Sequence, residues 1–223
     1  IIIDKKNKDS RKGIFFIDAK DGFKKDGAKN RLREQDIKRI VDAWDAQQNI
    51  PHYCRMVEWN EIEKNDYNLN IPRYIQPVDK EVQHDIEAHL HGGLPAFDID
   101  NMDAFWKACP TLKDSLVQIK DNGYYSLKPQ KAEISNVIDN DASYKEQGTA
   151  FAQLLNEWKD AVKPQMLAID QGERPKELIT EWSESLLAKV SGHSGLVDAY
   201  EVYDVLLNYW AEAMQDDCYM ISD

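Results

Sequence analysis

A cluster of cations between residues 20 and 33 is the strongest chemical signal in the sequence. Five basic side chains fall within ten positions: Lys24, Lys25, Lys29, Arg31 and Arg33. Gly22 and Gly27 indicate that they lie on a flexible basic loop, between a strand and a helix. Clustered cations in reach of a nucleic-acid backbone are sufficient for phosphate contact. A solvated loop would carry the same charges without a ligand, and the sequence leaves both interpretations open.

The charge of the chain is unevenly distributed. Its formal net charge is −12, but residues 1–39 hold 13 Lys and Arg against 7 Asp and Glu, a net of +6. The remaining 184 residues hold 15 against 33, a net of −18. We therefore expect a basic head that is able to meet phosphate, and an acidic body that avoids nucleic acid or meets a protein.

Other candidate sites are weaker. Asp85 and His89 lie at i, i+4, a spacing that suits two metal ligands, with His84 and His91 nearby. A third ligand at fixed spacing is missing, so this cluster predicts a solvated helix end rather than a metal site. The three cysteines are far apart, which is typical of buried or idle thiols in a reducing cytoplasm.

Two motifs of methyl transfer to a base are missing from the sequence. The ten glycines form no Gly-x-Gly turn of the kind that lets a backbone approach S-adenosylmethionine. No Pro-Pro pair is present to build the tetrapeptide that holds a flipped base. The segment Asn70–Arg73 is only a superficial echo of that tetrapeptide, because Ile71 stands where a proline is needed.

The first hundred residues predict short strands and a few helices. Strands are expected at Ile1–Ile3 and Gly13–Ala19, joined by a polar connection, and at Arg55–Glu58. A helix is expected from about Glu34, with Ile37, Ile40, Val41 and Trp44 on one apolar stripe. A helical turn over 61–65 and a helix from about 80 to 91, stopped by Gly92-Gly93, follow.

Beyond residue 100 the patterns predict almost only helices. Pro110 should start a helix that carries Leu112, Leu116 and Ile119, whereas 124–127 reads as a lone extended piece. Residues 143–146 have the capping-box spacing before a helix that Pro164 should end or kink. Pro175 should open the next helix, and Gly192 lies beyond its end. No run approaches the roughly 18 apolar residues that a membrane span requires.

The last predicted helix carries a heptad-like seam. Its members are spaced by four and three residues: Leu196, Tyr200, Tyr203, Leu207, Trp210 and Met214. A coiled-coil partner could dock on this face. The seam spans fewer than three heptads, however, so the sequence favours an ordinary core helix over a coiled-coil partner face.

The segment 65–75 (NDYNLNIPRYI) has two interpretations. As a connector, it would use Asn68 and Asn70 to satisfy backbone groups, while Tyr67, Leu69, Ile71 and Tyr74 alternate into a core. As a contact surface, it would direct Asn68, Asn70 and Arg73 toward DNA or a neighbouring subunit.

Several blocks, taken in order, carry a family resemblance. FFIDA, NRLREQDIKRIVD, NDYNLNIPRYI, DIEAHLHGGLPAFDID, GYYSLK and WAEAMQDDCYMISD resemble the modification (M) subunit of type I restriction-modification systems. The resemblance covers nearly the whole chain. It implies a parent enzyme that methylates adenine N6 in DNA with S-adenosylmethionine, in a prokaryotic cytoplasm.

The resemblance also implies a fold and partners. We expect a mainly α protein with a small β portion, in which residues 1–78 end a truncated α/β methyltransferase sheet and 79–223 form a C-terminal helical domain. The implied partners are a specificity (S) subunit, a second M subunit, a restriction (R) subunit and DNA, with no membrane. Both catalytic motifs of the family would lie before Ile1, so no catalytic, cofactor or metal residue carries over, and this part should bind no cofactor. Relatives continue past Asp223, so we also expect the chain to stop short of the parent's end.

Overall fold

The computed structural model describes residues 11–76, 85–120, 123–193 and 196–223. The chain divides into two compact units, residues 1–81 (unit 1) and 82–223 (unit 2). Unit 1 holds 17 Lys and Arg against 15 Asp and Glu, whereas unit 2 holds 11 against 25. The two units therefore carry net charges of +2 and −14.

A two-stranded sheet forms the centre of unit 1. Strand β1 (Gly13–Ile17) pairs antiparallel with β4 (Cys54–Glu58), and Gly13 lies opposite Glu58. Phe16 and Val57 pack with Ile62, Tyr74 and Ile75 in its core. Both strands were predicted, although β1 ends two residues earlier than expected. The predicted strand at Ile1–Ile3 lies outside the described residues, so the larger methyltransferase sheet stays a prediction.

The segment predicted as a basic loop is a β-hairpin. Strand β2 (Lys24–Asp26) pairs antiparallel with β3 (Lys29–Arg31), so only two residues form the turn. Gly27, the first of them, has φ +60°. A glycine with positive φ at this position suits a tight type II′ hairpin turn. The loop prediction was wrong because Gly27 was taken as a flexible point rather than as turn chemistry.

The helices of unit 1 begin close to their predicted positions. Helix α1 (Glu34–Ala46) starts at the predicted residue, and α2 (Trp59–Lys64) covers the predicted helical turn. A short 3-10 turn, η2 (Ile71–Arg73), follows within the segment 65–75, for which the sequence left two interpretations. Helix α1 buries Gln35, Asp36 and Ala43. Of its predicted apolar stripe, Ile37 and Val41 are exposed and Ile40 and Trp44 are half-buried.

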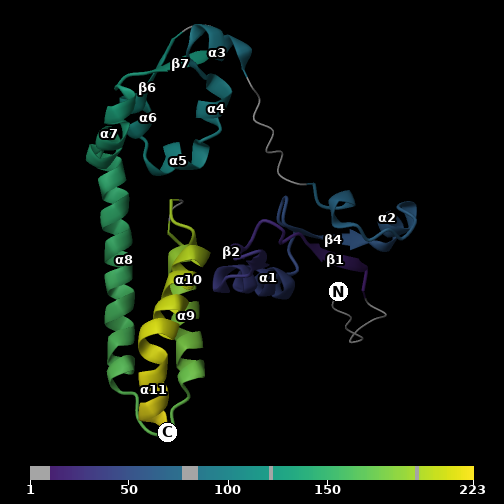
Figure 1. Ribbon diagram of the computed structural model, residues 1–223, viewed down its shortest axis with the longest axis vertical. Coiled ribbons are helices and arrows are strands. Elements are labelled where there is room, and N and C mark those ends of the chain that lie inside the picture. Colours follow the sequence, from purple (N-terminus) through teal and green to yellow (C-terminus); the bar gives the residue numbers. More distant parts are fainter. Residues whose placement is uncertain (1–10, 77–84, 121–122, 194–195) are drawn as a thin grey trace. The chain divides into compact units, whose positions relative to one another are not determined.

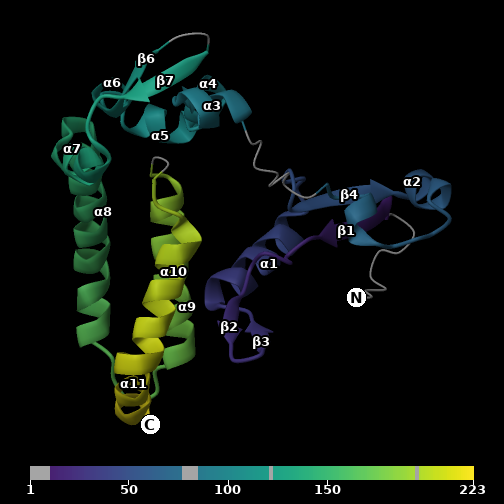
Figure 2. The same cartoon turned by 45° about the horizontal axis from the view of Figure 1, so that its top comes forward.

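The N-terminal part of unit 2 contains a three-stranded sheet with short helices. The elements in order are α3 (Ile86–His91), β5 (Leu94–Pro95), α4 (Ala96–Asp100), α5 (Asp103–Ala108), α6 (Leu112–Leu116), β6 (Val117–Ile119) and β7 (Tyr124–Leu127). Strand β7 lies between β5 and β6, and α4 lies beside it (Figure 2). The predictions of a lone strand at 124–127 and of Ile119 in a helix were therefore wrong. β7 finds its partners through long-range pairing, which local patterns do not reveal.

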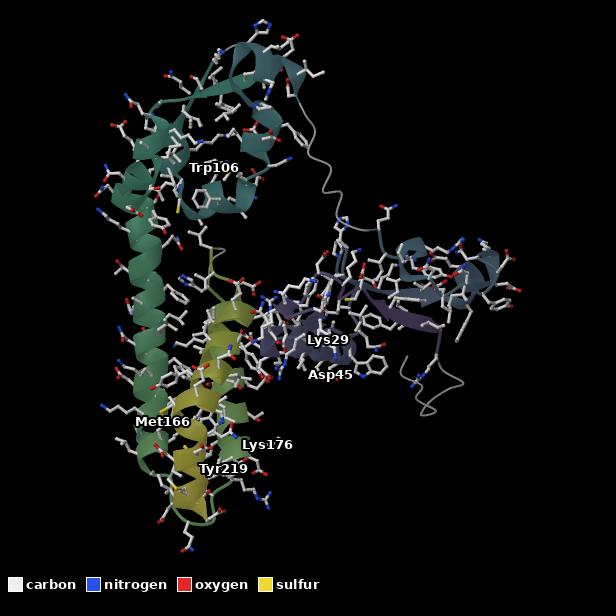
Figure 3. The ribbon with its side chains drawn as sticks, in the orientation of Figure 1. Lys29, Asp45, Trp106, Met166, Lys176 and Tyr219 are labelled. Atoms are coloured by element: carbon white, nitrogen blue, oxygen red, sulfur yellow. The ribbon has the colours of Figure 1, made fainter. Side chains whose placement is uncertain are left out.

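The remainder of unit 2 is a helical bundle. It comprises η3 (Lys131–Glu133), α7 (Ile134–Asn140), α8 (Ala142–Leu167), α9 (Pro175–Ser191), α10 (Ala199–Tyr209), a π-helical segment (Trp210–Met214) and α11 (Gln215–Ser222). Helix α8, helix α9 and the consecutive α10 and α11 run alongside one another (Figure 1). Trp182, Val162 and Trp210 lie in the core, with Met166 packed against them (Figure 3). The prediction of a mainly α protein with a small β portion is confirmed.

The observed helix ends in unit 2 agree with some of the predicted start and stop residues and differ from others. Helix α9 begins at Pro175 and has Gly192 at its C-cap, as predicted. Helix α8 is capped instead by Asp141, whose carboxylate accepts the Tyr144 N–H, so the predicted capping box at 143–146 was wrong. Helix α8 also continues to Leu167, three residues beyond Pro164. Helix α3 begins at Ile86 with Asp85 as its extended N-cap, and the first part of the helix predicted from about 80 lies outside the described residues.

Candidate nucleic-acid interface

The hairpin β2–β3 gathers most of the predicted cations on one face. Its register pairs Lys24 with Arg31 and Asp26 with Lys29, whereas Lys25 lies opposite Asn30. Paired residues of an antiparallel ladder share a face, and so do alternate residues along a strand. Three cations and one carboxylate therefore share one face, and all of them are exposed: Lys24, Asp26, Lys29 and Arg31.

This face has more positive charge than its own residues neutralise. Arg31 approaches Asp26 at 3.6 Å across exposed surface. Lys24 and Lys29 have no ion-pair or hydrogen-bond partner for their side chains among the described residues. Lys29 is labelled in Figure 3. Like charges directly across a ladder, as at Lys24 and Arg31, destabilise the pair. An anion placed between them would remove that repulsion.

The other two predicted cations are engaged within the chain. The Lys25 ammonium donates to Asn30 Oδ1 at 2.7 Å and lies 5.4 Å from the centre of the Phe23 ring. Arg33 donates from Nε and from Nη2 to the two carboxylate oxygens of Asp36, both at 2.9 Å. The backbone N–H of Arg33 also donates to Asp36 at 2.8 Å. Arg33 thus fixes the start of α1 instead of facing a ligand.

The Asp36 carboxylate stabilises the start of α1 through its hydrogen bonds with Arg33. The carboxylate is buried, and the hydrogen bond from the Arg33 side chain holds its pKa below the ordinary value. The hairpin precedes this point directly, because Arg31 ends β3 and Glu34 begins α1. The cationic face is therefore joined to a rigid element by only two residues.

The predicted connector motif divides into anchored and exposed residues. Tyr74 is buried, and its hydroxyl donates to the Asn68 carbonyl. The Asn68 side chain accepts the N–H of Asn70 at 3.0 Å, as a connector requires. Asn68, Asn70 and Arg73 nevertheless have exposed side chains. The expected alternation into a core was wrong for Tyr67 and Leu69, which are 67% and 46% exposed.

The predicted partner-helix face lies largely against the chain's own helices. Trp210 is buried with its ring 6.0 Å from that of Trp182, and Leu207 and Met214 pack on the same cluster. Tyr200 and Tyr203 are half-buried. Leu196 precedes α10, whose N-cap is Asp198, and packs against the other core cluster of unit 2. The predicted seam thus does not form one continuous helical face.

Two exposed sets of residues were not predicted as candidates. One is Tyr67 with Leu69, which the period-2 pattern had assigned to a core. The other is the outer face of α10 and α11, where Val205, Tyr209 and Met220 are exposed. Acidic side chains surround it, and no Lys or Arg follows Lys189 in the sequence. That charge asymmetry was visible in the sequence and could have directed attention to this face.

Two cavities of the described residues lack the glycine-rich turn that S-adenosylmethionine binding would use. A cavity of about 460 Å³ lies beside β4, lined by Asn49, His52, Tyr74 and neighbours. A second, of about 250 Å³, lies between α8 and α9. Neither is lined by glycine, and Arg55 beside the first is already engaged by Glu61 and the Tyr74 carbonyl. We therefore derive no step of methyl transfer from these residues.

The described residues hold neither a metal-ion cluster nor a membrane-spanning helix. In the described ranges, no three His, Cys, Asp or Glu side chains meet as a metal ion would require. Asp85 caps α3, His89 and His91 are exposed, and His84 lies outside those ranges. All three cysteines are buried and free, as predicted. No helix of the described chain is both long and apolar enough to cross a membrane.

Comparisons with known proteins found similarity in the N-terminal part of the chain. Residues 1–83 match the family model of N-6 DNA methylases. Among curated proteins, the chain is 38% identical over 94 residues to the type I restriction enzyme MjaVII methylase subunit of Methanocaldococcus jannaschii. It is 33% identical over 90 residues to the MjaVIII methylase subunit of the same organism. It is 30% identical over 91 residues to the MpnII methylase subunit of Mycoplasma pneumoniae.

These matches confirm the predicted resemblance over the N-terminal part. They cover 39–41% of this chain but only 16–17% of each relative's length. The matched part thus spans about a sixth of the length of each of these relatives. No solved structure matches the chain.

Proposed function

We propose that this chain is part of the modification subunit of a type I restriction-modification system. The parent enzyme would transfer a methyl group from S-adenosylmethionine to adenine N6 in DNA. The chain itself would be non-catalytic and would serve DNA-backbone contact and subunit assembly. The observation that carries this proposal is the match of residues 1–83 to the N-6 DNA methylase family, together with three curated relatives that are methylase subunits.

Methyl transfer by the parent protein tests the enzymatic part. The full-length protein, its specificity subunit and genomic duplex DNA are incubated with methyl-labelled S-adenosylmethionine. We expect label at adenine N6. Label on cytosine, or no transfer under conditions in which the subunits assemble, would contradict the proposal.

Within unit 1, the hairpin β2–β3 is the proposed contact to DNA phosphate. Its support is the exposed face of Lys24, Lys29 and Arg31, whose repulsion a phosphate would relieve. Three such contacts should give a slope of log affinity against log salt near −2.7, at about −0.9 per phosphate. Binding should be independent of sequence and weak, with a Kd of roughly 10⁻⁴–10⁻⁶ M.

A charge-matched pair of variants tests the hairpin. Lys24→Gln, Lys29→Gln and Arg31→Gln together should abolish most of the binding to random-sequence duplex DNA and flatten its salt slope. The control replaces three exposed lysines of unit 2 with glutamine: Lys159, Lys163 and Lys176. It changes the net charge equally and should leave the slope as it is. Equal losses in both variants would show that only total charge matters.

Assembly is a second proposed role, favoured by the outer face of α10 and α11. Val205, Tyr209 and Met220 are exposed there among Glu201, Glu212 and Asp216. An apolar stripe with only acidic neighbours suits a basic amphipathic segment of another subunit. This face replaces the buried seam of Leu207 and Trp210 as the proposed contact to the specificity subunit.

Paired substitutions separate the two faces. Val205→Asp with Tyr209→Asp should weaken binding of the specificity subunit at least tenfold without changing thermal stability. Leu207→Asp with Trp210→Asp should unfold the bundle instead. Wild-type affinity in a folded Val205/Tyr209 variant would eliminate the outer face as the contact.

A further inference from the structure

The hairpin β2–β3 is a narrow ribbon with two polar faces. All six residues of its ladder are exposed: Lys24, Lys25, Asp26, Lys29, Asn30 and Arg31. It forms a sheet of its own, apart from β1 and β4 (Figure 2). Its turn consists of Gly27 and Ala28, the two smallest residue types, and no described atom lies within 4 Å of a Cβ placed on Gly27. The tip of the ribbon is therefore slim and open.

The charges of the ribbon favour a surface position in the longer parent protein as well. Charged side chains are almost never fully buried unless they are paired, and Lys24 and Lys29 have no such partner among the described residues. The exposed apolar side chains of α1, such as Ile37 and Val41, differ in this respect, since another part of the parent could cover them. An occupant of the ribbon is expected to supply negative charge instead.

One carboxylate on the cationic face does not suit contact with phosphate alone. Asp26 lies beside the turn, opposite Lys29, and its carboxylate is 3.6 Å from the Arg31 guanidinium. The Arg31 and Asp26 side chains are 70% and 62% exposed, so this ion pair stabilises the hairpin little. A phosphate placed against Asp26 would be repelled. Asp26 is suited to a hydrogen-bond donor that lies close to the phosphates attracted by the cations.

The major groove of duplex DNA offers such donors between two rows of phosphates. Every base pair presents one amino group there, at adenine N6 or cytosine N4, and both can donate to a carboxylate. In the minor groove only guanine carries an amino group, and A·T pairs present acceptors alone, which would repel Asp26. The major groove is about 12 Å wide and admits a two-stranded ribbon.

Side-chain length separates the two kinds of contact. Asp26 is short and lies at the turn, so it reaches a base edge only when the tip enters the groove. Lys24 and Arg31 lie two residues behind Asp26 and Lys29 along their strands, a distance of about 7 Å. Their longer side chains, like that of Lys29, suit the phosphates at the rims of the groove.

We infer that the hairpin β2–β3 enters the major groove of duplex DNA tip first, where Asp26 accepts a hydrogen bond from a base amino group. Lys24, Lys29 and Arg31 contact the phosphates on either side. Because every base pair offers an amino group, this contact is independent of sequence. The inference rests on the proposed function, which makes the hairpin a DNA contact, and it adds the groove and the role of Asp26.

Modified duplexes test the choice of groove. The full-length parent protein is compared with its triple variant Lys24→Gln, Lys29→Gln, Arg31→Gln, and the ratio of their affinities measures the contribution of the hairpin. Three duplexes of one sequence serve as probes: unmodified, with inosine in place of guanine, and with glucosylated 5-hydroxymethylcytosine in place of cytosine. Inosine removes only the amino group in the minor groove. The glucose occupies the major groove and adds no charge.

The affinity ratio should be at least about tenfold on the unmodified and inosine duplexes and should fall to about one on the glucosylated duplex. An undiminished ratio on the glucosylated duplex would overturn the inference and leave the hairpin as a contact to the backbone alone. A ratio that falls on the inosine duplex instead would place the hairpin in the minor groove and overturn the inference as well. A ratio of one on the unmodified duplex would refute the DNA contact of the proposed function itself.

The sign of a second effect tests Asp26. Asp26→Ala makes the face more positive, so a surface that touched only phosphate would bind DNA more tightly. We expect weaker binding to the unmodified duplex, by roughly threefold or more, because one hydrogen bond is lost. The control is Glu34→Ala, which adds the same charge at an exposed position near the hairpin and should bind at least as tightly as the wild type. Thermal unfolding confirms that both variants are folded. Unchanged or tighter binding by Asp26→Ala would overturn the inference.

Discussion

Two amphipathic helices of this protein use their apolar faces in opposite ways. Helix α1 turns Gln35, Asp36 and Ala43 toward its own unit, while Ile37 and Val41 are 44% and 45% exposed. The helix formed by α10 and its π-helical segment turns Leu207 and Trp210 inward, and its outer face is acidic with exposed Val205 and Tyr209. Unit 2 therefore completes its own core at this helix, whereas α1 leaves apolar surface uncovered.

This difference shows that the spacing of apolar residues in the sequence predicts the apolar face of a helix, but not whether another part of the protein covers that face. Burial of a stripe depends on partners that lie far away in the sequence, such as Trp182 for Trp210. In α1 one of the buried positions is a carboxylate, Asp36, which forms an ion pair with Arg33 at the helix start. The uncovered stripe of α1 is consistent with our proposal that unit 1 belongs to a larger methyltransferase domain.

The largest expected effect lies in the core of unit 2. Trp210→Ala should lower the free energy of unfolding by about 3–5 kcal/mol, because it removes a buried indole and leaves a cavity. Tyr209→Ala, one residue away on the exposed side, is the control and should cost little. Thermal unfolding followed by circular dichroism measures both. Equal losses would contradict the assignment of inner and outer faces.

The β1–β4 sheet of unit 1 is expected to be almost as sensitive at one position. A Cβ on Gly13 would lie 1.8 Å from the Val57 carbonyl oxygen, so Gly13→Ala must push β1 away from β4. We expect a cost of about 3 kcal/mol, at the upper end of overpacking. In α8, Gly148 has open space around it. Gly148→Ala should stabilise unit 2 by about 0.5–1 kcal/mol in the same denaturation assay.

These positions also show how far the sequence could predict the structure. Local signals located α1, β4 and the start of α9 at Pro175, since caps, prolines and short periodic runs act within a few residues. Local signals did not reveal that β7 lies between β5 and β6. They also predicted a capping box at 143–146, whereas Asp141 is the N-cap of α8. Strand pairing and cap competition depend on tertiary context. Among the site residues, the cations were found from composition alone, but Arg33's engagement with Asp36 required the fold.

The start of α1 should weaken in acid in a defined direction. The Arg33 hydrogen bond lowers the pKa of Asp36 in the folded protein, so its stabilisation is present above the unfolded pKa near 3.9. It is lost as the pH falls through the folded pKa. The stability gap between wild type and Asp36→Asn should therefore be constant above about pH 5 and close in acid. A gap that widens on acidification would show that the sign is wrong.

The smallest expected effect concerns the exposed stripe of α1. Ile37→Ala should change the stability of the chain by no more than about 0.5 kcal/mol, because that side chain is already half in solvent. The buried Ile62 of α2 is the matched control, and Ile62→Ala should cost about 2–5 kcal/mol. Chemical denaturation compares the two. A large loss at Ile37 would mean that the stripe is covered within the chain after all.

The division of labour between the two units is tested most directly by mapping where DNA touches the chain. The backbone amide chemical shifts of the isotope-labelled chain are followed while a random-sequence duplex is added at low salt. Our account predicts shifts confined to residues 20–33, with α8 to α11 unchanged. They should also disappear when Lys24, Lys29 and Arg31 are replaced by glutamine. Shifts that centre on unit 2, or that survive this triple substitution, would contradict it.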